Sequence, residues 1–493
     1  MDPHPSTASL AAATAVEIAA DLAAGRTTSV AVTQALLERI AAVDHSGPEL
    51  RSVLALNAAA LDDAAALDDE RAAGALRGPL HGVPVLVKDN IEVLGLPASA
   101  GSLALAGREV VRDAPLVTAM RAAGLVVLGA TNLSEWANMR SPHSTSGWSA
   151  VGGLTGNPWK LDRSAGGSSS GSGAAIAAGL APLAIGTETD GSITCPSSLN
   201  GCVGLKPTVG VVSTVGVVPL SGSQDSPGPM ARSVRDAALL LSALTGETSY
   251  SEAPGTVTPG DLRLGVAAGW LSNHPGTDAM FADVLRVIEA AGATLSEADV
   301  TPVAGTGAAE LTVLVCELQE DLGAYLAARG GQGPGSIAEL VAFNSVHSDV
   351  ELAHFGQEFL EMAASSEGRA DPAYAEARAR CLQWALEETL EPSFEGAEAP
   401  EFLVAPAYAP AWKSDLRGGD HFLGGGLASA APSIAGWPVL CLPMGLVEGL
   451  PVGLVLVGRP RSEARLLAAG HALEELLDLR ESLHPTWLPP SRG

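Results

Sequence analysis

Helix-like and strand-like patterns of apolar residues are mixed along the whole chain. Residues 8–75 are dominated by Ala, Leu, Glu and Arg, and segments such as VAVTQALLERIAAV have the apolar spacing of a helix. The β-branched run VPVLV then predicts a buried strand that Lys88 directly follows. Residues 116–128 predict a helix and a strand. The following TNLSEWANM predicts a capped helical segment with Ser134 or Asn132 as its cap.

The second half continues the mixture without an internal repeat. Residues 141–159 predict an irregular loop, 231–245 an amphipathic helix, and 262–304 strand, helix and strand, with the helix near 279–291. Residues 316–393 predict a mostly helical cap. FLVAPAYAP, WPVLCLPMG and PVGLVLVGRP predict strands, and RSEARLLAAGHALEELL predicts the last helix. We therefore expect an α/β fold with one large sheet and, since no linker divides the chain, a single domain over 1–493.

Residues 164–216 form a Gly- and Ser-rich stretch that does not have the character of a flexible linker. Two apolar segments, Ala174–Leu180 and Pro182–Ile185, interrupt it, and a linker would carry no apolar runs able to pack. Glycine lets the backbone turn tightly and approach a ligand closely. The stretch therefore predicts an active site on loops that buried strands and helices hold in place.

Composition excludes several classes of function. The net charge of −27 opposes binding to nucleic acid or to an anionic membrane surface, which need clustered Lys and Arg. No window reaches the roughly 18 apolar residues of a membrane span, and the Ala-rich N-terminus lacks the basic region of a signal peptide. Five scattered cysteines indicate reduced thiols in a cytoplasm. The histidines have no HExxH spacing, so we expect no metal.

Lys88 is one of only four lysines in the chain. A lysine beside a buried strand is costly unless it is paired or neutral. Two interpretations stay open on this stretch alone. Lys88 forms a salt bridge with a neighbour such as Asp89, or it is a desolvated base with a lowered pKa.

Three interpretations of the serine-rich run compete. Residues 167–171 match GxSxG with Ser169 at the centre, and Asp415 or Asp420 with His421 would complete a hydrolase triad. In a run of such low complexity the match has little specificity. The motif also requires a strand directly before it, and WKLDRSAG does not have the pattern of a strand. GGSSSGSG before a helix could also hold a phosphate, but no GxxxxGK[ST] is present.

The third interpretation is a resemblance to a family. GGSSSGSGAAIAAGLAPLAIGTETDGSI and GVPVLVKDN resemble the amidase signature family, as do TNLSEWAN, GCVGLKP, GPMARSVRDAA, AGWPVLCLPMG and GLPVGLVLVGRP. The resemblance covers about residues 15–480. It implies an amidase signature fold, one large mixed sheet flanked by helices on both faces. Its core would span about 75–245, its helical cap about 316–393 and its C-terminal strands about 400–460.

The resemblance also implies a site without cofactor or metal. Lys88, Ser168 and Ser192 match the family's Ser–cisSer–Lys triad, with Ser192 as nucleophile, Ser168 as proton relay after a cis peptide bond, and Lys88 as base. The oxyanion hole would consist of the backbone N–H groups of Thr189, Asp190, Gly191 and Ser192. Candidate substrate contacts are Ala137, Asn138, Met139, Ser144 and Gly167.

The turn before Ser192 departs from the family's usual TDxGGSIR. Here it is TETDGSIT, so Glu188, Asp190 and Thr194 differ, and the φ angle at Asp190 is in doubt because Asp tolerates unusual φ less well than Gly. TETDGSI, SEWANMRSPHSTSGWSA and SQDSPGPMARSV resemble the branch that contains bacterial peptide amidases. That branch removes the amide from peptide C-terminal carboxamides.

The resemblance leaves the substrate and the assembly open. The chain is expected to be an amidase for a small-molecule primary or aryl amide and to form an acyl-enzyme. Alternatives are an anilide or aryl carbamate (urethane) hydrolase, and the A-type subunit of a glutamine-dependent amidotransferase, which works with partner proteins and tRNA. We expect a cytoplasmic monomer or homodimer. Acidic groups and aromatics of the cap would favour neutral, apolar substrates; the four aromatics are Tyr325, Phe343, Phe355 and Phe359.

Overall fold

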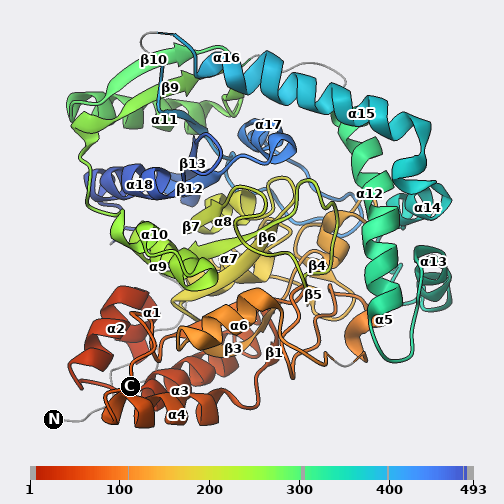
Figure 1. Ribbon diagram of the computed structural model, residues 1–493, viewed down its shortest axis with the longest axis horizontal. Helices are drawn as coiled ribbons and strands as arrows, with labels where there is room; N and C mark the ends of the chain where they lie inside the picture. Colours follow the sequence, from red (N-terminus) through yellow and green to blue (C-terminus); the bar gives the residue numbers. More distant parts are fainter. Residues whose placement is uncertain (1–6, 109, 301–305, 397–398, 481, 486–493) are drawn as a thin grey trace.

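A mixed sheet of eleven strands runs through the molecule (Figure 1). The computed structural model describes residues 7–108, 110–300, 306–396, 399–480 and 482–485. The strand order is β1-β3-β2-β6-β8-β7-β12-β13-β11-β9-β10, and β4 and β5 form a separate pair. The strands are β1 (Val53–Leu56), β2 (Pro84–Lys88), β3 (Val126–Thr131), β4 (Trp148–Ser149), β5 (Gly153–Leu154), β6 (Leu183–Glu188), β7 (Val203–Lys206), β8 (Ser226–Ala231), β9 (Arg263–Ala267), β10 (Thr294–Ala298), β11 (Phe402–Pro406), β12 (Val439–Val447) and β13 (Leu450–Val457).

Helices flank this sheet, and those of residues 306–393 run along its outside, down the right and across the top of Figure 1. The α-helices are α1 (Thr7–Ala12), α2 (Ala15–Ala23), α3 (Ser29–Arg39), α4 (Ala60–Ala72), α5 (Leu103–Ala106), α6 (Pro115–Ala122), α7 (Ser170–Ala178), α8 (Thr194–Asn200), α9 (Val234–Thr245), α10 (Ser249–Glu252), α11 (Pro275–Ala290), α12 (Thr306–Ala328), α13 (Ile337–Val346), α14 (Glu358–Ser365), α15 (Pro372–Leu382), α16 (Glu391–Ser393), α17 (Leu427–Ala435) and α18 (Glu463–Leu477). Short 3-10 segments are η2 (Glu135–Asn138), η3 (Pro259–Asp261), η4 (Ala268–Trp270) and η5 (Gly368–Ala370), and π-helical turns are η1 (Ile40–Asp44) and η6 (Gln383–Leu390).

The expected α/β fold with one large mixed sheet is confirmed, and most predicted elements are present. The run VPVLVK forms β2, whose five residues are all buried. The segments predicted at 116–128, 231–245 and 279–291 form α6 with β3, α9, and α11. Of the strand–helix–strand segment, residues 301–304 lie outside the described residues, as do residues 1–6 of the N-terminus. Strong apolar periodicity therefore located the elements correctly.

Three local predictions differ from the structure. Residues 53–56 form a strand, β1, inside the region predicted as helical, because they pair with β3 along the sheet edge. The loop predicted at 141–159 contains the short β4–β5 pair. Neither Ser134 nor Asn132 caps η2: the Ser134 hydroxyl accepts from Gly147 N, and the Asn132 side-chain oxygen accepts from Leu133 N.

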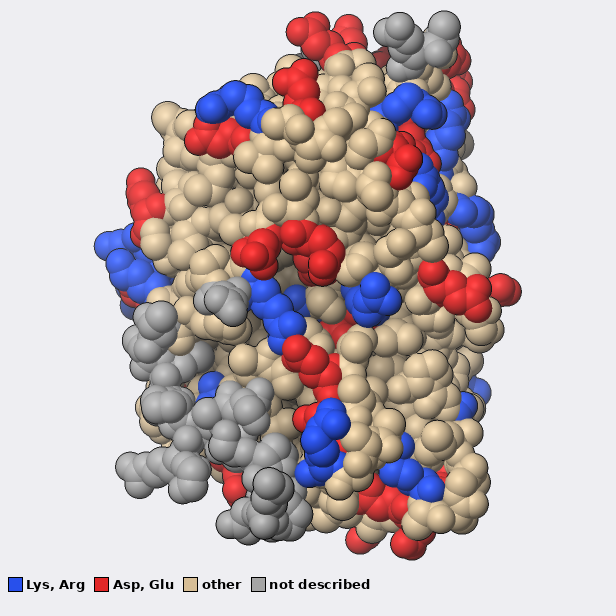
Figure 2. All heavy atoms as spheres, turned by 90° about the vertical axis from the view of Figure 1, so that its left-hand side faces the viewer, with Lys and Arg blue, Asp and Glu red and all other residues tan. Residues whose placement is uncertain are grey.

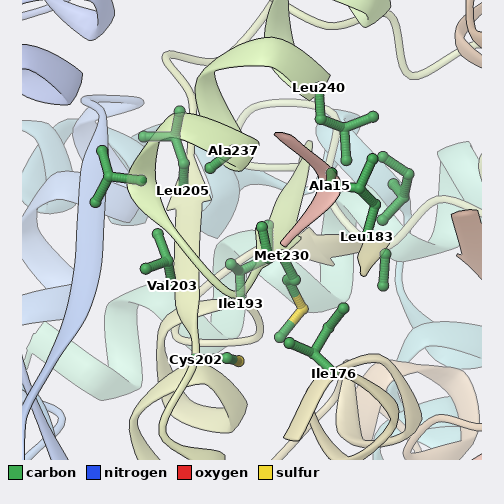
Figure 3. Close-up of a cluster of buried hydrophobic side chains, with 14 of the residues drawn as sticks. Ala15, Ile176, Leu183, Ile193, Cys202, Val203, Leu205, Met230, Ala237 and Leu240 are labelled. Carbon is green, nitrogen blue, oxygen red and sulfur yellow. The ribbon is translucent and has the colours of Figure 1, made fainter. Parts of the chain in front are cut away.

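The core on one face of the central strands extends directly to the Gly- and Ser-rich stretch. Figure 3 shows Leu183 of β6, Met230 of β8 and Leu205 of β7 packed together with Ile193, the residue after Ser192. Ile193 has no exposed surface. Burying a side chain of this size typically contributes about 1.5–3 kcal/mol. The core therefore holds one side of Ser192 in place.

Parallel pairing brings two strand ends to one place. β2 pairs parallel with β6, with Val87 opposite Ile185. Because parallel neighbours end at the same edge of a sheet, Lys88 at the end of β2 lies near the last residues of β6. The sheet thereby assembles residues that are about a hundred positions apart in sequence.

Candidate active site

Lys88 is fully buried and lies in contact with hydroxyl groups. Its Nζ donates to Ser168 Oγ at 2.7 Å, to Thr187 Oγ1 at 2.9 Å and to the Thr187 carbonyl at 3.3 Å. Burial lowers the pKa of Lys88 to about 7, although the negative charges of Asp225 and Glu188 oppose that shift. At neutral pH a large fraction of this lysine is therefore uncharged and able to accept a proton.

The salt-bridge interpretation of Lys88 is wrong. Asp89 accepts hydrogen bonds from the backbone N–H and the hydroxyl of Ser99. Lys88 forms no ion pair within the described ranges. The carboxylate next to Lys88 in sequence thus faces away from it, as alternation along a strand requires.

Ser168 connects Lys88 to the start of α7. The Gly167–Ser168 peptide bond is cis, the bond that the family resemblance implies at this position. The Ser168 carbonyl accepts from Ser134 N at 3.0 Å. A Cβ on Gly167 would collide with the Ser134 hydroxyl and lie 2.8 Å from Ser146 Oγ. A side chain at position 167 would therefore displace Ser134 and Ser146, whereas glycine fits.

The turn after β6 has one left-handed residue, Gly191, with φ of 77°. A Cβ on Gly191 would lie 2.5 Å from the Tyr408 hydroxyl, so glycine is required twice over. Asp190 has no positive φ, which removes the doubt raised by its replacing the usual glycine. No acceptor is found in the described part of the chain for the backbone N–H groups of residues 190–192. Donors without a protein partner at a turn are what an oxyanion hole requires.

Ser192 lies beside the Ser168 loop, with a hydroxyl that makes no hydrogen bond to the described residues. Its carbonyl accepts from Ser169 N at 3.1 Å, which joins the two loops side by side. Ser192 is mostly buried, with 9% of its surface exposed. The structure therefore brings Lys88 and Ser168 into direct contact and places Ser192 next to them, with its hydroxyl unengaged.

Of the three residues that depart from the family's usual turn, Glu188 and Asp190 make side-chain contacts, whereas the Thr194 hydroxyl has no hydrogen-bond partner among the described residues. Glu188 Oε2 accepts from the backbone N–H groups of Ile193 and Thr194, at 2.7 and 2.8 Å. The Asp190 carboxyl is hydrogen-bonded to Ser429, and burial, with the charge of Glu310 nearby, raises its pKa well above the usual range. Glu188 therefore fixes the backbone on the far side of Ser192, and Asp190 tends to be protonated.

Three polar residues of the site escaped the sequence analysis. Thr187 Oγ1 accepts from both Lys88 Nζ and Asn90 Nδ2, the latter at 3.0 Å. Asp225 accepts the Thr189 hydroxyl at 2.6 Å, and burial raises the pKa of Asp225 to about 6. Their position in the predicted strands could have indicated two of them: Thr187 and Asn90 lie at the ends of adjacent parallel strands, where ligand-binding residues gather.

The loop predicted to contact substrate has an unusual backbone. Trp136, Ala137 and Asn138 have φ of 49°, 53° and 71°, three consecutive left-handed residues that are not glycine. Each costs roughly 1–2 kcal/mol, so the surroundings must hold them. Ala137 and Asn138 are half-buried and Met139 is buried. This loop therefore presents Ala137 and Asn138 at a surface.

Other contacts of this region are local. Asn138 Nδ2 donates to Ser146 Oγ at 3.1 Å, next to Gly167. The Ser144 hydroxyl accepts from Ser141 N at 3.2 Å, within its own turn, and among the described residues it makes no hydrogen bond to the triad. Of the five expected substrate contacts, Asn138 and Gly167 are thus linked through Ser146.

The helical block of residues 306–393 packs against the same loop. Trp136 and Met139 share a buried cluster with residues of α12, α13 and α14. Buried Arg140 donates to Glu135 Oε1 at 2.7 Å and to the Glu351 carbonyl at 2.5 Å, and burial raises the pKa of Glu135 well above its usual range. The left-handed loop is therefore held by a buried ionic cluster and by apolar packing.

The four aromatics of the cap differ in their surroundings. Phe355 lies against Trp148 and under the Arg140 guanidinium, 4.0 Å from its ring centre. Phe343 stacks on His347 with ring centres 4.0 Å apart. The Tyr325 hydroxyl donates to Glu92. Phe355 and Tyr325 thus join the cap to the core, Phe343 contacts its own helix end, and Phe359 is half-buried in the cap cluster.

The two competing interpretations of the serine-rich run are excluded by its contacts. The Ser169 hydroxyl exchanges hydrogen bonds with the backbone of Thr187. His421 pairs with Asp415 at an exposed position, and Asp420 binds Ser146. The N–H groups that would hold a phosphate are used internally: Ser169 N and Gly171 N donate to backbone carbonyls.

Other expectations concerned thiols, metals and membranes. All five cysteines are unpaired and buried. Within the described ranges no group of His, Cys, Asp and Glu side chains is arranged to hold a metal ion. No described helix is both long and apolar enough to cross a bilayer.

A cavity of about 380 Å³ lies away from these residues and is lined by residues of α2 and α18. Figure 2 shows that side, where acidic and basic side chains surround a hollow. Arg232, His471 and Arg480 line the cavity, but none of the predicted catalytic residues does. Side-chain chemistry, not cavity size, therefore identifies the candidate active site at Lys88, Ser168 and Ser192.

Comparison with known proteins agrees with this site. The family model described as Amidase matches residues 31–467. The solved peptide amidase of Stenotrophomonas maltophilia is 43% identical and superposes with a TM-score of 0.86, covering 94% of this chain and 97% of its own. Peptide amidase PAM in complex with the competitive inhibitor chymostatin is 43% identical with a TM-score of 0.88, covering 97% and 99%.

A second kind of relative is also similar over almost the whole chain. The A-type subunit of the glutamyl-tRNA(Gln) amidotransferase of Symbiobacterium thermophilum is 34% identical over 481 residues, which are 93% of this chain and 96% of that relative. The family model and the full-length similarity to amidases leave one conclusion on the class of protein. The chain belongs to the amidase family, and it is an enzyme that hydrolyses amides.

Proposed function

We propose that Ser192 is the nucleophile, Ser168 the proton relay and Lys88 the base of a Ser–cisSer–Lys triad. One observation carries this proposal: fully buried Lys88 lies 2.7 Å from the Ser168 hydroxyl. Its pKa of about 7 supports a base that is uncharged in the neutral range. Ser192, with its free hydroxyl beside Ser168, is left to attack the substrate.

The proposed reaction begins with two proton transfers. As Ser192 Oγ bonds to the amide carbon, its proton passes to Ser168 and the Ser168 proton passes to Lys88. The negative charge on the former carbonyl oxygen accepts hydrogen bonds from the backbone N–H groups of residues 189–192. Loss of one such donor typically costs about 3 kcal/mol in the transition state.

The second half of the reaction returns the protons. Lys88 gives its proton through Ser168 to the leaving nitrogen, the C–N bond breaks, and ammonia leaves from a primary amide. Water then attacks the Ser192 acyl ester, again assisted by Lys88, and releases the carboxylic acid. No metal or cofactor takes part in these steps, so exhaustive chelation should leave the rate unchanged.

For the substrate we propose the C-terminal carboxamide of a peptide. Similarity to peptide amidases at 43% identity and the TETDG turn support this choice. Burial and the nearby Glu310 and Glu188 raise the pKa of Asp190, so a further negative charge, such as the free carboxylate of a substrate, is disfavoured beside this turn. Anilides and aryl carbamates are the alternative substrates, because the same acyl transfer cleaves them.

The decisive experiment compares one peptide as its C-terminal amide with the same peptide extended by one residue as the free acid. We expect a much higher kcat/KM for the amide. Preferential cleavage of the internal bond in the free acid would indicate a protease and refute the proposal. In parallel, a fluorophosphonate should label Ser192, and labelling of Ser169 in its place would contradict the triad.

The 34% identity to the A-type subunit of an amidotransferase supports a second candidate function. That relative works on glutamyl-tRNA(Gln), as its name states, and the net charge of −27 opposes binding of tRNA. The purified chain alone should hydrolyse simple amides. Activity that appears only after partner proteins and tRNA are added would favour the second candidate.

We also propose that the chain acts in the cytoplasm as a monomer or homodimer of one amidase signature domain. The eleven-stranded sheet, which joins β1 near the start of the chain to β13 near its end, supports one domain over 1–493. Its proposed parts are a signature core at about 75–245, a helical cap at about 316–393 and C-terminal core strands at about 400–460. Sedimentation of the purified chain would test the assembly.

A further inference from the structure

Residues 415–426 form a Gly-rich loop that connects the two sides of the candidate active site. On the Ser168 side, Asp420 accepts from Ser146 Oγ at 2.5 Å and from Ser146 N at 3.0 Å. Ser146 Oγ is the atom that would lie 2.8 Å from a Cβ on Gly167, next to Ser168. The middle of the loop is therefore anchored one residue away from the proposed relay serine.

The other end of the loop is anchored beside the Ser192 turn. Gly426 N donates to the Ala407 carbonyl at 2.8 Å, and the ring of Tyr408 packs closely against Gly426. The Tyr408 hydroxyl is the atom nearest to where a Gly191 Cβ would be, at 2.5 Å. The loop thus spans from the Ser168 side to the Ser192 side.

Between these anchors the loop carries apolar side chains that face solvent. Phe422 is 57% exposed and Leu423 48% exposed, and Leu427 follows at 37% at the start of α17. Within the described residues most other exposed large apolar side chains occur singly, as they do on ordinary surfaces. Three within six positions beside a catalytic site indicate a binding surface.

The Phe422 ring extends a row of aromatic rings that begins at the Ser192 turn. Its centre lies 4.5 Å from the buried Trp412 ring and 6.3 Å from the Tyr408 ring. Trp412 is itself fixed by its indole N–H, which donates to Asp420 at 3.1 Å. A continuous aromatic wall therefore leads from Gly191 through Tyr408 to the exposed Phe422.

We propose that Phe422, together with Leu423, determines specificity by contacting the apolar side chain of the residue whose C-terminal amide is cleaved. This inference rests on the proposed function and identifies its substrate class as amides of aromatic or large aliphatic residues. An aryl side chain at the wall would bury apolar area and pack ring against ring. Among the cap aromatics, Phe355 is buried against Trp148 and Phe343 is stacked on His347.

The test measures a selectivity ratio, the kcat/KM for N-acetyl-phenylalanine amide divided by that for N-acetyl-glycine amide. Phe422→Ala should lower this ratio about tenfold, because a tenfold change corresponds to only part of the free energy gained by burying one aromatic ring. Phe422→Trp should keep the ratio within about threefold of wild type, because a ring remains. Val346→Ala, at an exposed position at the end of α13, is the matched control and should not change it.

The outcomes separate this inference from the proposed function. A ratio that stays at its wild-type value in Phe422→Ala and in the double variant Phe422→Ala/Leu423→Ala would overturn the inference while the amidase activity stands. A wild-type enzyme that hydrolyses neither amide would refute the proposed function, and the inference with it. Melting temperatures of all variants check that a lowered ratio does not come from unfolding.

Discussion

At the scale of single residues, two buried lysines show how surroundings decide a role. Lys206, like Lys88, is fully buried, and burial lowers its pKa to about 8. Its Nζ donates only to the carbonyls of Trp437 and Pro207 among the described residues, whereas Lys88 contacts two hydroxyl groups. A carbonyl cannot pass on a proton, so only Lys88 is placed to act as a base.

The first prediction follows from the pKa of about 7 for Lys88. The ammonium form cannot accept a proton, so kcat/KM should rise with pH through about 7 and level off above it. Lys88→Ala should lower kcat by about 10²–10⁴-fold at every pH, the usual contribution of a general base. Lys160→Ala, at an exposed site, serves as the control. Near-normal rates for Lys88→Ala across the pH range would remove lysine from the mechanism.

A second prediction concerns the fit of Gly191 against Tyr408. Gly191→Ala should lower kcat about 100-fold, because its left-handed φ strains any Cβ and the Tyr408 hydroxyl occupies the space. In the double variant Gly191→Ala/Tyr408→Phe the collision is removed and only the strain remains, so part of the rate should return. If Tyr408→Phe restores nothing, the close approach at Gly191 is not what limits the turn.

Extended, specific motifs made Lys88, Ser168 and Ser192 the candidate triad, and the structure brings Lys88 and Ser168 into contact. Sequence reasoning missed Thr187 and Asn90, which are ordinary polar residues until the parallel pairing of β2 and β6 brings them together. Spacing in the sequence also could not show that Phe355 of the cap is buried against Trp148. Local pattern thus locates chemistry, whereas pairing across the sheet decides which groups meet.

At the scale of elements, long periodic segments were predicted well and the short η2 segment was not. Strong apolar periodicity fixes helices such as α9 and α18, because one face must be buried. The backbone of η2 instead depends on distant groups: Arg140 is held by the carbonyl of Glu351, 211 positions away. Tertiary contacts of that kind leave no mark in the local sequence.

The third prediction tests that ionic cluster. Arg140→Met leaves the buried carboxyl groups of Glu135 and Glu351 without their partner. Breaking a buried pair typically costs about 3–5 kcal/mol, so Tm should fall by several degrees, and KM should rise as Ala137 and Asn138 lose their position. Arg51→Met removes an exposed pair with Glu49 and should cost less than about 1 kcal/mol. Equal Tm values for both variants would contradict a structural role of the cluster.

At the scale of the whole molecule, some of the carboxyl groups that outnumber the basic side chains are buried. The net charge is −27, and several carboxyl groups are buried with raised pKa values. Burial raises the pKa of Asp89 to about 7, and the pKa values of Asp225 and Asp236 to about 6. Each accepts hydrogen bonds from backbone N–H groups, which limit the shift without reversing it. The folded protein therefore binds more protons near pH 6 than the unfolded chain does.

The last prediction is that stability and activity depend on pH in opposite directions. A carboxyl whose pKa is raised on folding stabilises the protein below its unfolded pKa, and this contribution is lost as pH rises through the folded pKa. For Asp89, Asp225 and Asp236 the loss extends from about pH 4 to about pH 7. Lys88 and Lys206, with lowered pKa values, change stability only at and above about pH 7, so they do not cancel the loss below it.

Melting curves between pH 5 and pH 7 should therefore show Tm falling by roughly 2–5 °C as pH rises, while kcat/KM increases over the same interval. Asp89→Asn should flatten the Tm profile, because the group with the highest of the three pKa values no longer titrates. Asp415→Asn is the matched control: this exposed carboxyl has a pKa of about 2, so it stays ionised throughout and its removal should leave the slope unchanged. A Tm that rises from pH 5 to pH 7 would contradict raised pKa values for these buried carboxyl groups, because ionisation would then accompany folding and not oppose it.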